Sequence, residues 1–594
     1  MGKKIEYDTA MAWTQYVTDS PQEHLATQPA RHEVVIERGL RIPMRDGTQL
    51  SAVLWRPDTA GPFPTLVERG PHRLEERTGP AGEYHAARGY AVLSVGLRGC
   101  AGSEGTFTGT IPGSPTGDGY DTIEWITRQP WCNGRIGMIC GSISGLTQYQ
   151  TAVEAPPSLT ALLVREGPFQ LPNSPQLGLP LLALQFVTIA WTEHRLAHIS
   201  PELQDKAQAL VKCWQQEWQQ AQAALATDSP FLPVPAMLNR LPLYPNPEFA
   251  EIADFYDGHL VPPTEGGLPS TTLAEEANQV SIPICHLGGW FDGLLPDVLT
   301  AFTAFKEHAQ STAVRQKQRL IIGPWVHGPA ATTGQAVGLL EFGPNATLDF
   351  LALRQRWYDA MLQDTGNVSD DPTVWLYLTG PDRWLAFADW PPPATPTHWY
   401  LHGTTLIASP PTDAESPDSY EYDPMNPVPT LAGGGAFGIG LDQRPVEDRL
   451  LAYTSEPLAA PLTLVGPVQA ILHAASSAPD TDWVVRLTMV RPDGASVILS
   501  GGVLTARYRH AVDEPALLEA NQPERFVINM MPISIEIPAG YCLRLTVTSS
   551  DFPAYARNLN TGQAIAKASK GQVAINQIFH DSLHPSHVVL PVLA

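Results

Sequence analysis

Short apolar runs alternate with stretches of helical spacing in the first third of the chain. The apolar runs resemble buried strands, and they cover residues 34–36, 50–55, 64–67, 90–95 and 136–140. Residues 119–129 instead repeat their apolar positions at helical spacing. Strands that alternate with helices predict a mostly parallel sheet with helices on its faces.

Helical patterning takes over between about residues 172 and 280. Apolar side chains recur at helical spacing within residues 201–226, namely Leu203, Ala207, Leu210, Val211, Trp214 and Trp218. A proline-rich stretch at 229–247 interrupts the pattern, and strand-like runs return at 282–287 and 319–322. We therefore predict a discontinuous α/β domain with a helical insertion, which is either a cap over an active site or an additional packing layer.

Beyond a helical pattern at 352–362, the chain shows only short alternating segments separated by Gly and Pro turns. They lie at residues 374–378, 398–401, 468–472, 483–487 and 542–547. This pattern predicts a C-terminal β-sandwich. The expected domains are 1–170, the first part of the α/β domain; 171–280, the helical cap; 281–365, the second part; and 366–594, the β domain.

Composition and charge narrow the class of protein. A chain of 594 residues exceeds what one hydrophobic core supports, so two or three domains are expected. The net charge of −23 is spread along the chain, which argues against nucleic-acid or anionic-membrane partners. Six scattered cysteines without C-x-x-C spacing predict reduced thiols rather than disulfides or a zinc site. With no apolar run long enough for a bilayer and no secretory pattern, the sequence predicts a cytoplasmic protein, and leaves homo-oligomerisation open.

Candidate chemistry begins where the predicted strand at 136–140 runs into a turn of small residues. Ser142 stands at the apex of this turn, where a nucleophilic serine is commonly placed, although a lone turn of this kind usually holds only a capping serine. Ser144 is a second candidate. Such a turn needs small residues two places to either side, and these are Cys140 and Ser144 for Ser142, whereas Ser144 would have the bulky Leu146. Steric fit therefore favours Ser142.

Two later strands end in residues that could complete a serine-based site. Asp292 follows the strand at 282–287, and His327 follows the strand at 319–322. Ser, Asp and His in this order at strand ends match the triad order of α/β-hydrolases. We predict Ser142 as nucleophile, His327 as general base and Asp292 as the group that orients it, with the Ile143 N–H as one oxyanion donor and with no metal or cofactor.

The same chain resembles the cocaine esterase (CocE/NonD) family of serine hydrolases, which is related to X-Pro dipeptidyl peptidases and α-amino acid ester hydrolases. The resemblance covers nearly the whole chain. Besides the three turns, it includes residues 98–99, 103–107, 118–126, 129–134, 453–458, 480–483 and 507–509. It implies an α/β-hydrolase domain, an inserted helical cap and a C-terminal jelly roll, with hydrolysis at the domain junction.

The chain departs from the family pattern near the nucleophile. The family usually has Gly-x-Ser-Tyr-x-Gly, whereas Cys140 replaces the first Gly and Ile143 replaces the Tyr. The family also commonly has a Tyr that supplies the second oxyanion donor, and His72 occupies the matching position. An imidazole N–H can also donate, so His72 is predicted either as that donor or as an ordinary loop histidine.

The residues leave the substrate open within limits. Gly293, Leu294 and Leu295 follow Asp292, where α-amino acid ester hydrolases have acidic residues that bind the substrate ammonium, so an α-amino ester is not expected. Apolar residues in 179–187, together with Trp290, Phe291 and Trp325, line either an apolar acyl or aryl pocket or the core.

The leading hypothesis is a serine hydrolase that cleaves a small-molecule ester, in preference to an amide, through an acyl-enzyme. One alternative is an acyltransferase or cyclase that uses the same acyl-enzyme, because a dry cap would favour an acceptor other than water. A different class, a catalytically silent binding protein, is suggested by the altered serine turn.

Overall fold

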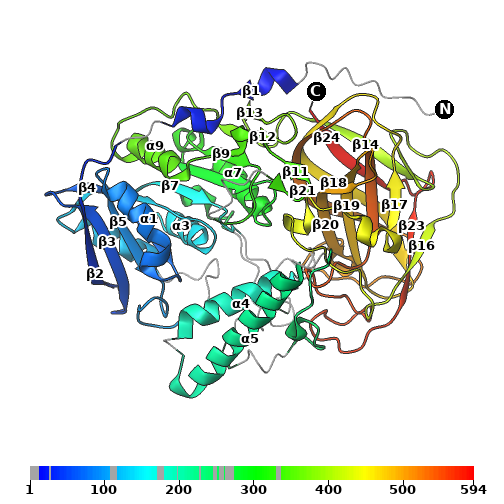
Figure 1. The fold of residues 1–594 in the computed structure, drawn as a ribbon, viewed down its shortest axis with the longest axis horizontal. Coiled ribbons are helices and arrows are strands. Elements are labelled where there is room, and N and C mark those ends of the chain that lie inside the picture. Colours follow the sequence, from blue (N-terminus) through cyan, green and yellow to red (C-terminus); the bar gives the residue numbers. More distant parts are fainter. Residues whose placement is uncertain are drawn as a thin grey trace.

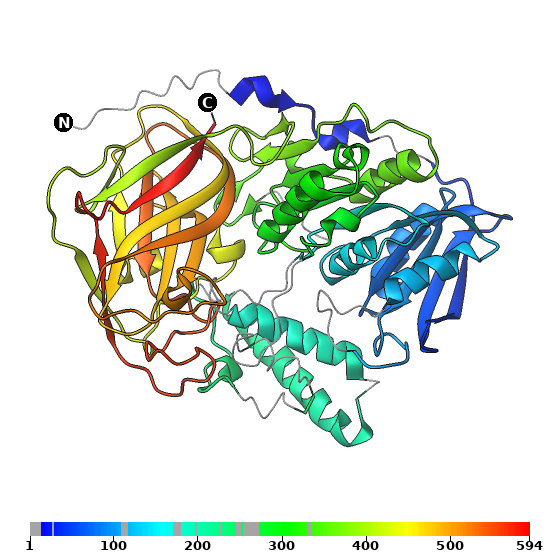
Figure 2. The same cartoon turned by 180° about the vertical axis from the view of Figure 1, so that it is seen from behind.

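The computed structural model describes residues 13–25, 29–107, 117–169, 180–196, 199–225, 229–244, 251–252, 260, 273–328 and 336–593. A mixed α/β part and a β-rich part lie beside each other, and a pair of helices projects at their junction (Figures 1 and 2). The N-terminal residues considered for a secretory signal, and parts of the predicted cap, fall outside the described residues. No described helix is long and apolar enough to cross a membrane.

The first sheet has eleven strands in the order β1-β13-β12-β9-β8-β7-β6-β4-β5-β3-β2. Its strands are β1 Val17–Thr18, β2 Val34–Pro43, β3 Gln49–Pro57, β4 Phe63–Gly70, β5 Ala91–Gly96, β6 Cys132–Met138, β7 Leu159–Arg165, β8 Ile284–Gly289, β9 Arg319–Gly323, β12 Val374–Leu378 and β13 Arg383–Phe387. The pairs from β5 through β12 are parallel, and the outer pairs are antiparallel. Strands such as β5 and β8 are buried on both faces, which explains their continuous apolar runs.

Helices accompany this sheet along the chain, as the alternating pattern predicts. They are α1 Leu74–Ala86, α2 Asp118–Thr127, α3 Ile143–Val153, α7 Leu295–His308, α8 Thr312–Arg315 and α9 Phe350–Leu362. Arg98 donates two hydrogen bonds of 2.7 Å to Asp118 at the start of α2. These two residues belong to the motifs that resemble the family, and here they join the segment after β5 to α2.

Two helices, α4 Leu181–Arg195 and α5 Pro201–Leu225, connect β7 to β8 (Figure 1). The strands on either side of this insertion are neighbours in one sheet, so the α/β part is discontinuous in sequence. A separate apolar cluster joins α5 to the segment after β5 and to the β-rich part, through Leu210, Val211, Trp214, Leu97, Phe107, Phe552 and Ala566. The insertion is therefore packed against both neighbouring parts of the molecule.

The C-terminal part is a second, largely antiparallel sheet system with strand order β16-β23-β18-β24-β14-β15-β17-β22-β19-β20, and β21 pairs with β18. Its strands are β14 Thr395–His402, β15 Thr405–Ile407, β16 Asp418–Tyr422, β17 Leu451–Thr454, β18 Leu462–Ser476, β19 Asp482–Val490, β20 Ser496–Thr505, β21 Glu524–Ile537, β22 Cys542–Thr548, β23 Ala574–Phe579 and β24 His587–Val592. A small hairpin of β10 Ala336–Val337 and β11 Leu340–Glu341 precedes it.

One strand lies in a different sheet from the one that its pattern suggests. Residues 374–378 form β12, which pairs in parallel with β9 and therefore extends the first sheet rather than the C-terminal one. All five side chains of β12 are buried, as in a strand covered on both faces. The predicted division at residue 365 thus precedes two strands, β12 and β13, that hydrogen-bond into the α/β sheet.

Candidate active site

The serine turn begins immediately after β6 and has an unusual backbone. Cys140 has φ +94°, and Ser142 has φ +57° and ψ −130°, both in regions that residues with side chains rarely adopt. A Cβ atom on Gly141 would lie 2.2 Å from the Arg165 carbonyl oxygen, so only glycine fits there. The Ser142 N–H donates to that same oxygen at 3.0 Å. The end of β7 therefore holds the strained turn in place.

The two serines of the turn point to different surroundings. Ser144 is fully buried, and its hydroxyl donates to Glu68 Oε1 at 3.2 Å. The Ser142 hydroxyl instead lies 3.1 Å from His327 Nε2. This geometry agrees with the steric argument that favours Ser142 as the nucleophile.

Asp292 and His327 are brought to Ser142 by the ends of β8 and β9. His327 Nδ1 lies 3.0 Å from Asp292 Oδ2, and Leu294 N–H donates to Asp292 Oδ1 at 2.9 Å. Asp292 is almost completely buried, whereas the His327 side chain is 44% exposed. Serine, imidazole and carboxylate thus form one continuous chain of hydrogen bonds, in the arrangement that a serine nucleophile requires.

Close packing between the two loops fixes this arrangement. A Cβ atom on Gly289 would lie 2.1 Å from the Trp325 carbonyl oxygen, and Phe291 N–H donates to that oxygen at 3.1 Å. Glycine at position 289, the last residue of β8, is therefore needed for the approach of the histidine loop.

The charges around His327 stabilise its protonated form relative to that of a free imidazole. Burial lowers the pKa of His327, but the hydrogen bond and charge of Asp292 and the charge of Glu166 outweigh this effect, so the pKa is raised overall. Such carboxylates stabilise the imidazolium that forms when a histidine accepts a serine proton.

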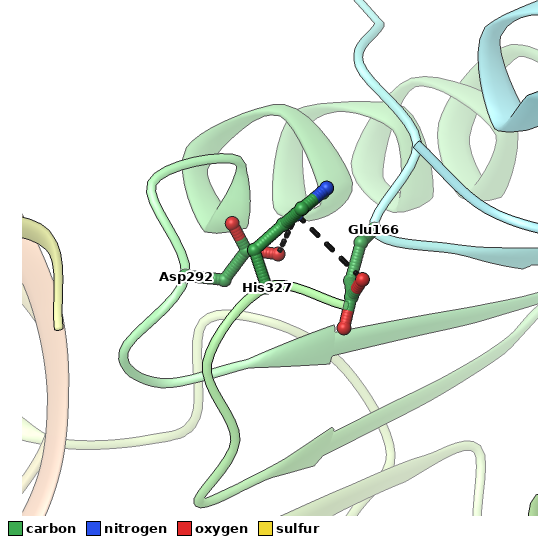
Figure 3. A group of neighbouring side chains, drawn as sticks. All are labelled: Glu166, Asp292 and His327. Carbon is green, nitrogen blue, oxygen red and sulfur yellow. Dashed lines mark hydrogen bonds and ion pairs between the residues drawn. The ribbon is translucent and has the colours of Figure 1, made fainter. Parts of the chain in front are cut away.

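Glu166 is the site residue that sequence reasoning missed. It follows β7 directly and is 2% exposed, and its Oε2 lies 3.6 Å from His327 Nδ1 (Figure 3). The available signal was a charged pair, Arg165 and Glu166, at the end of an otherwise apolar strand. Glu166, Asp292 and His327 each place a possible metal-ligand atom within 4.8 Å of the others. Because His327 is hydrogen-bonded on both ring nitrogens to Asp292 and Ser142, we interpret the group as acid–base machinery.

The two predicted oxyanion donors lie beside the turn. Ile143 is the first residue of α3, so its N–H belongs to the helix end that has no intrahelical acceptor. His72 lies two residues beyond the end of β4, and a Cβ atom on Gly70 would be 3.8 Å from His72 Cδ2 and 2.5 Å from Ser144 Oγ. His72 therefore lies just after β4, the strand next to β6, and its role as a donor stays a prediction.

The aromatic residues considered for a substrate pocket belong to the core. Trp290 and Trp325 are 2% exposed, and their indole N–H groups donate to the carbonyl oxygens of Tyr377 and Ala346, each at 2.9 Å. Phe291 is also buried and stacks on Phe342. These three aromatic residues therefore support the loops rather than face a substrate, and the core alternative is the correct one for them.

Comparison with known proteins places this geometry in a family. A model of the X-Pro dipeptidyl-peptidase (S15 family) matches residues 46–329, and a model of the X-Pro dipeptidyl-peptidase C-terminal non-catalytic domain matches residues 366–589. The cocaine esterase of Rhodococcus sp. (strain MB1 Bresler) is 32% identical over 596 residues, which cover 94% of this chain and 98% of the relative. The chain belongs to the cocaine esterase family of serine hydrolases.

Solved structures extend the likeness of this cocaine esterase family member to more distant enzymes. An aminopeptidase from the marine sediment archaeon Thaumarchaeota archaeon has a TM-score of 0.73 at 22% identity, with 97% of this chain and 99% of the other covered. An alpha-amino acid ester hydrolase has a TM-score of 0.72 at 22% identity, with 96% and 98% covered. At this level of identity the comparison establishes a shared fold.

Proposed function

We propose that this member of the cocaine esterase family hydrolyses small-molecule carboxylic esters with Ser142 as nucleophile, His327 as general base and Asp292 as its orienting acid. The observation that carries the proposal is the chain of contacts from Ser142 Oγ to His327 Nε2 at 3.1 Å and from His327 Nδ1 to Asp292 Oδ2 at 3.0 Å. Such a chain activates a serine hydroxyl that is otherwise a weak nucleophile.

In the proposed reaction, Ser142 Oγ attacks the ester carbonyl carbon while its proton moves to His327 Nε2. The tetrahedral intermediate collapses, the C–O bond to the leaving alcohol breaks, and His327 returns the proton to the alcohol oxygen. Water then attacks the acyl carbon while its proton moves to His327. The bond from the acyl carbon to Ser142 Oγ breaks, His327 returns the proton to Ser142 Oγ, and the carboxylic acid leaves. Asp292 keeps its hydrogen bond to Nδ1 throughout.

The developing oxyanion needs donors on the side of the serine turn. The Ile143 N–H stands at the positive end of α3, where negative charge is stabilised. We assign the second donor to His72, in the position where the family commonly has a Tyr. Because both contacts would use N–H groups, replacement of the family Tyr residues by His72 and Ile143 is compatible with activity.

The proposal extends to domain roles. We propose that α4 and α5 form a cap, and that the C-terminal sheets form a jelly roll, with divisions near residues 170 and 280 and a last division that lies after β13 rather than at residue 365. Hydrolysis is favoured over acyl transfer because the His327 side chain is 44% exposed and therefore accessible to water.

Because Gly293 and Leu294 follow Asp292, we propose an ester that lacks an α-ammonium group.

A pair of serine variants tests this function. Ser142→Ala is expected to abolish hydrolysis of p-nitrophenyl esters and labelling by a fluorophosphonate probe, because no other hydroxyl of the turn faces His327. Ser144→Ala is the matched control: it removes only the bond to Glu68, which contributes about 1 kcal/mol to stability, and it should keep both activities. Retention of hydrolysis by folded Ser142→Ala protein would overturn the proposal.

A further inference from the structure

A second carboxylate approaches the same imidazole nitrogen as Asp292. In Figure 3 Asp292 and Glu166 lie to either side of His327. Glu166 Oε2 is 3.6 Å from His327 Nδ1, compared with 3.0 Å for Asp292 Oδ2, so Glu166 is within ion-pair range. A negative charge at this distance, on a side chain that is 2% exposed, raises the proton affinity of the imidazole.

The backbone of the sheet holds Glu166 rigidly in this position. Its N–H donates to the Leu287 carbonyl oxygen of β8 at 2.8 Å, and its φ of +50° is rare for a residue with a side chain. The preceding residue, Arg165, accepts the Ser142 N–H. Glu166 therefore lies between the strand end that fixes the nucleophile and the strand that leads to Asp292.

Glu166 also binds the main chain of the histidine loop. Gly328, the residue after His327, donates its N–H to Glu166 Oε2 at 3.0 Å. Asp292 thus orients the ring of His327, while Glu166 holds the adjacent backbone and faces Nδ1 with the same oxygen atom. Both acids act on one histidine from neighbouring strands.

We propose that Glu166 is a positioning residue for the general base, which fixes the His327 loop and supplies a second negative charge that stabilises the His327 imidazolium. This inference rests on the proposed serine hydrolase function. The proton balance of the reaction is unchanged: the proton travels from Ser142 Oγ to His327 Nε2 and on to the leaving alcohol. Glu166 neither accepts nor donates a proton in these steps.

The groups around Glu166 couple its ionisation to that of His327. Burial and the charge of Asp292 raise the pKa of Glu166, and the charge of Arg165, whose Nε lies 3.6 Å away, lowers it together with His327 and the Gly328 N–H. The pKa of Glu166 is raised overall. Protonation of His327 therefore favours the charged form of Glu166. The second carboxylate consequently exerts its full effect when the imidazolium is present.

Glu166→Gln separates the charge from the shape, because the amide oxygen can still accept the Gly328 N–H. We expect kcat to fall about tenfold with little change in KM, and the acid limb of the kcat/KM profile to move to lower pH by about one pH unit, since one pKa unit corresponds to a factor of ten. A purely structural role would change the melting temperature and leave the acid limb in place.

A double-variant comparison sharpens the test. In Asp292→Asn enzyme, Glu166 is the remaining carboxylate that faces His327 Nδ1. Adding Glu166→Gln should therefore lower kcat about a hundredfold, rather than the tenfold expected when Asp292 is present, because the effects of coupled groups are not additive. Equal costs in both backgrounds, together with an unmoved acid limb, would overturn the inference. If Glu166→Gln does not fold, Glu166→Asp can be used instead. Its shorter side chain keeps the carboxylate but moves it away from His327, so the acid limb should shift in the same direction by a smaller amount.

Asp297 provides the matched control for loss of a carboxylate nearby. It accepts the Phe169 N–H at 2.9 Å, three residues beyond Glu166, so Asp297→Asn removes one negative charge from the support of the same segment. The acid limb of this variant should stay within about 0.3 pH units of the wild type, because the charges that act most strongly on the pKa of His327 are those of Asp292, Glu166 and Arg165. Fluorophosphonate labelling of Ser142 in each variant distinguishes failure of this inference, with labelling retained, from failure of the proposed function.

Discussion

At the scale of single residues, the reactivity of Ser142 depends on the atoms that surround it. The hydroxyl is directed to His327 by a backbone conformation with φ +57°, which few non-glycine residues adopt. Cys140, with φ +94°, adds a second such residue where the family usually has glycine. Backbone strain of this kind costs of order 1–3 kcal/mol per residue, and here the end of β7 compensates for it.

The pKa of His327 leads to a prediction about pH. Burial lowers this pKa and the two carboxylates raise it more, so it lies above the ordinary value of 6.5. His327 must be neutral to accept the Ser142 proton, and activity is therefore lost as pH falls through the raised pKa. A kcat/KM profile with a neutral ester should show an acid limb with a midpoint above pH 6.5. A midpoint below 6.5 would contradict the described electrostatics.

At the scale of elements, the site forms where adjacent parallel strands end. The segments after β6, β7, β8 and β9 bring Ser142, Glu166, Asp292 and His327 together at one edge of the sheet. Three of these residues could be predicted because each stands in a glycine-containing turn after an apolar strand. Glu166 could not, because a single acidic residue at a strand end is common and only its distance to His327 reveals its position.

Other elements show where sequence patterns are insufficient. A buried strand in a parallel sheet and a core strand of a β-sandwich have the same apolar run, so β12 was expected in the wrong sheet. In the same way, the pattern could not distinguish aromatic residues of a pocket from those of the core. The hydrogen bonds of Trp290 and Trp325 to backbone carbonyl groups make that distinction.

The contact between the serine turn and β7 can be tested with a single methyl group. Gly141→Ala would place a Cβ atom 2.2 Å from the Arg165 carbonyl oxygen, so the turn or the strand must move. We expect a loss of about 1–3 kcal/mol in the free energy of unfolding, as for other overpacked sites, and a severe loss of kcat. Chemical denaturation and steady-state kinetics measure these effects.

Gly79→Ala is a suitable control for this substitution. Gly79 lies in α1, and an added Cβ atom would meet no atom within 4 Å. This variant should retain activity with little change in stability, because the higher helix propensity of alanine is opposed by contact between its Cβ atom and the ring of Pro80, the next residue. Wild-type activity in Gly141→Ala enzyme would show that the turn does not need the close approach.

At the scale of the whole molecule, the α/β part and the β-rich part share one hydrophobic core. The cluster that includes Phe291 and Trp325 beside the site continues to Ile439, Ile498 and Ile535 of the C-terminal part. Backbone hydrogen bonds also connect the two, including Ala436 N–H to Phe291 O at 3.0 Å. The loop that carries Asp292 is therefore supported in part by the C-terminal domain.

This shared core predicts cooperative unfolding of the two parts. Scanning calorimetry should show one transition, because unfolding of either part would expose the apolar face of the other. Loss of esterase activity on heating should coincide with that transition. Two well-separated transitions, with activity surviving the first, would show that the C-terminal part does not support the site.

The proposed reaction passes through an acyl group on Ser142. The most direct measurement is mass spectrometry of enzyme quenched during turnover of a p-nitrophenyl ester, followed by proteolysis and mapping of the modified peptide. We expect one added acyl mass, located on Ser142 and lost with continued incubation in water. An acyl group on Ser144 would contradict the proposed reaction. Hydrolysis that shows a burst of p-nitrophenol but leaves no covalent adduct on Ser142 would contradict it as well.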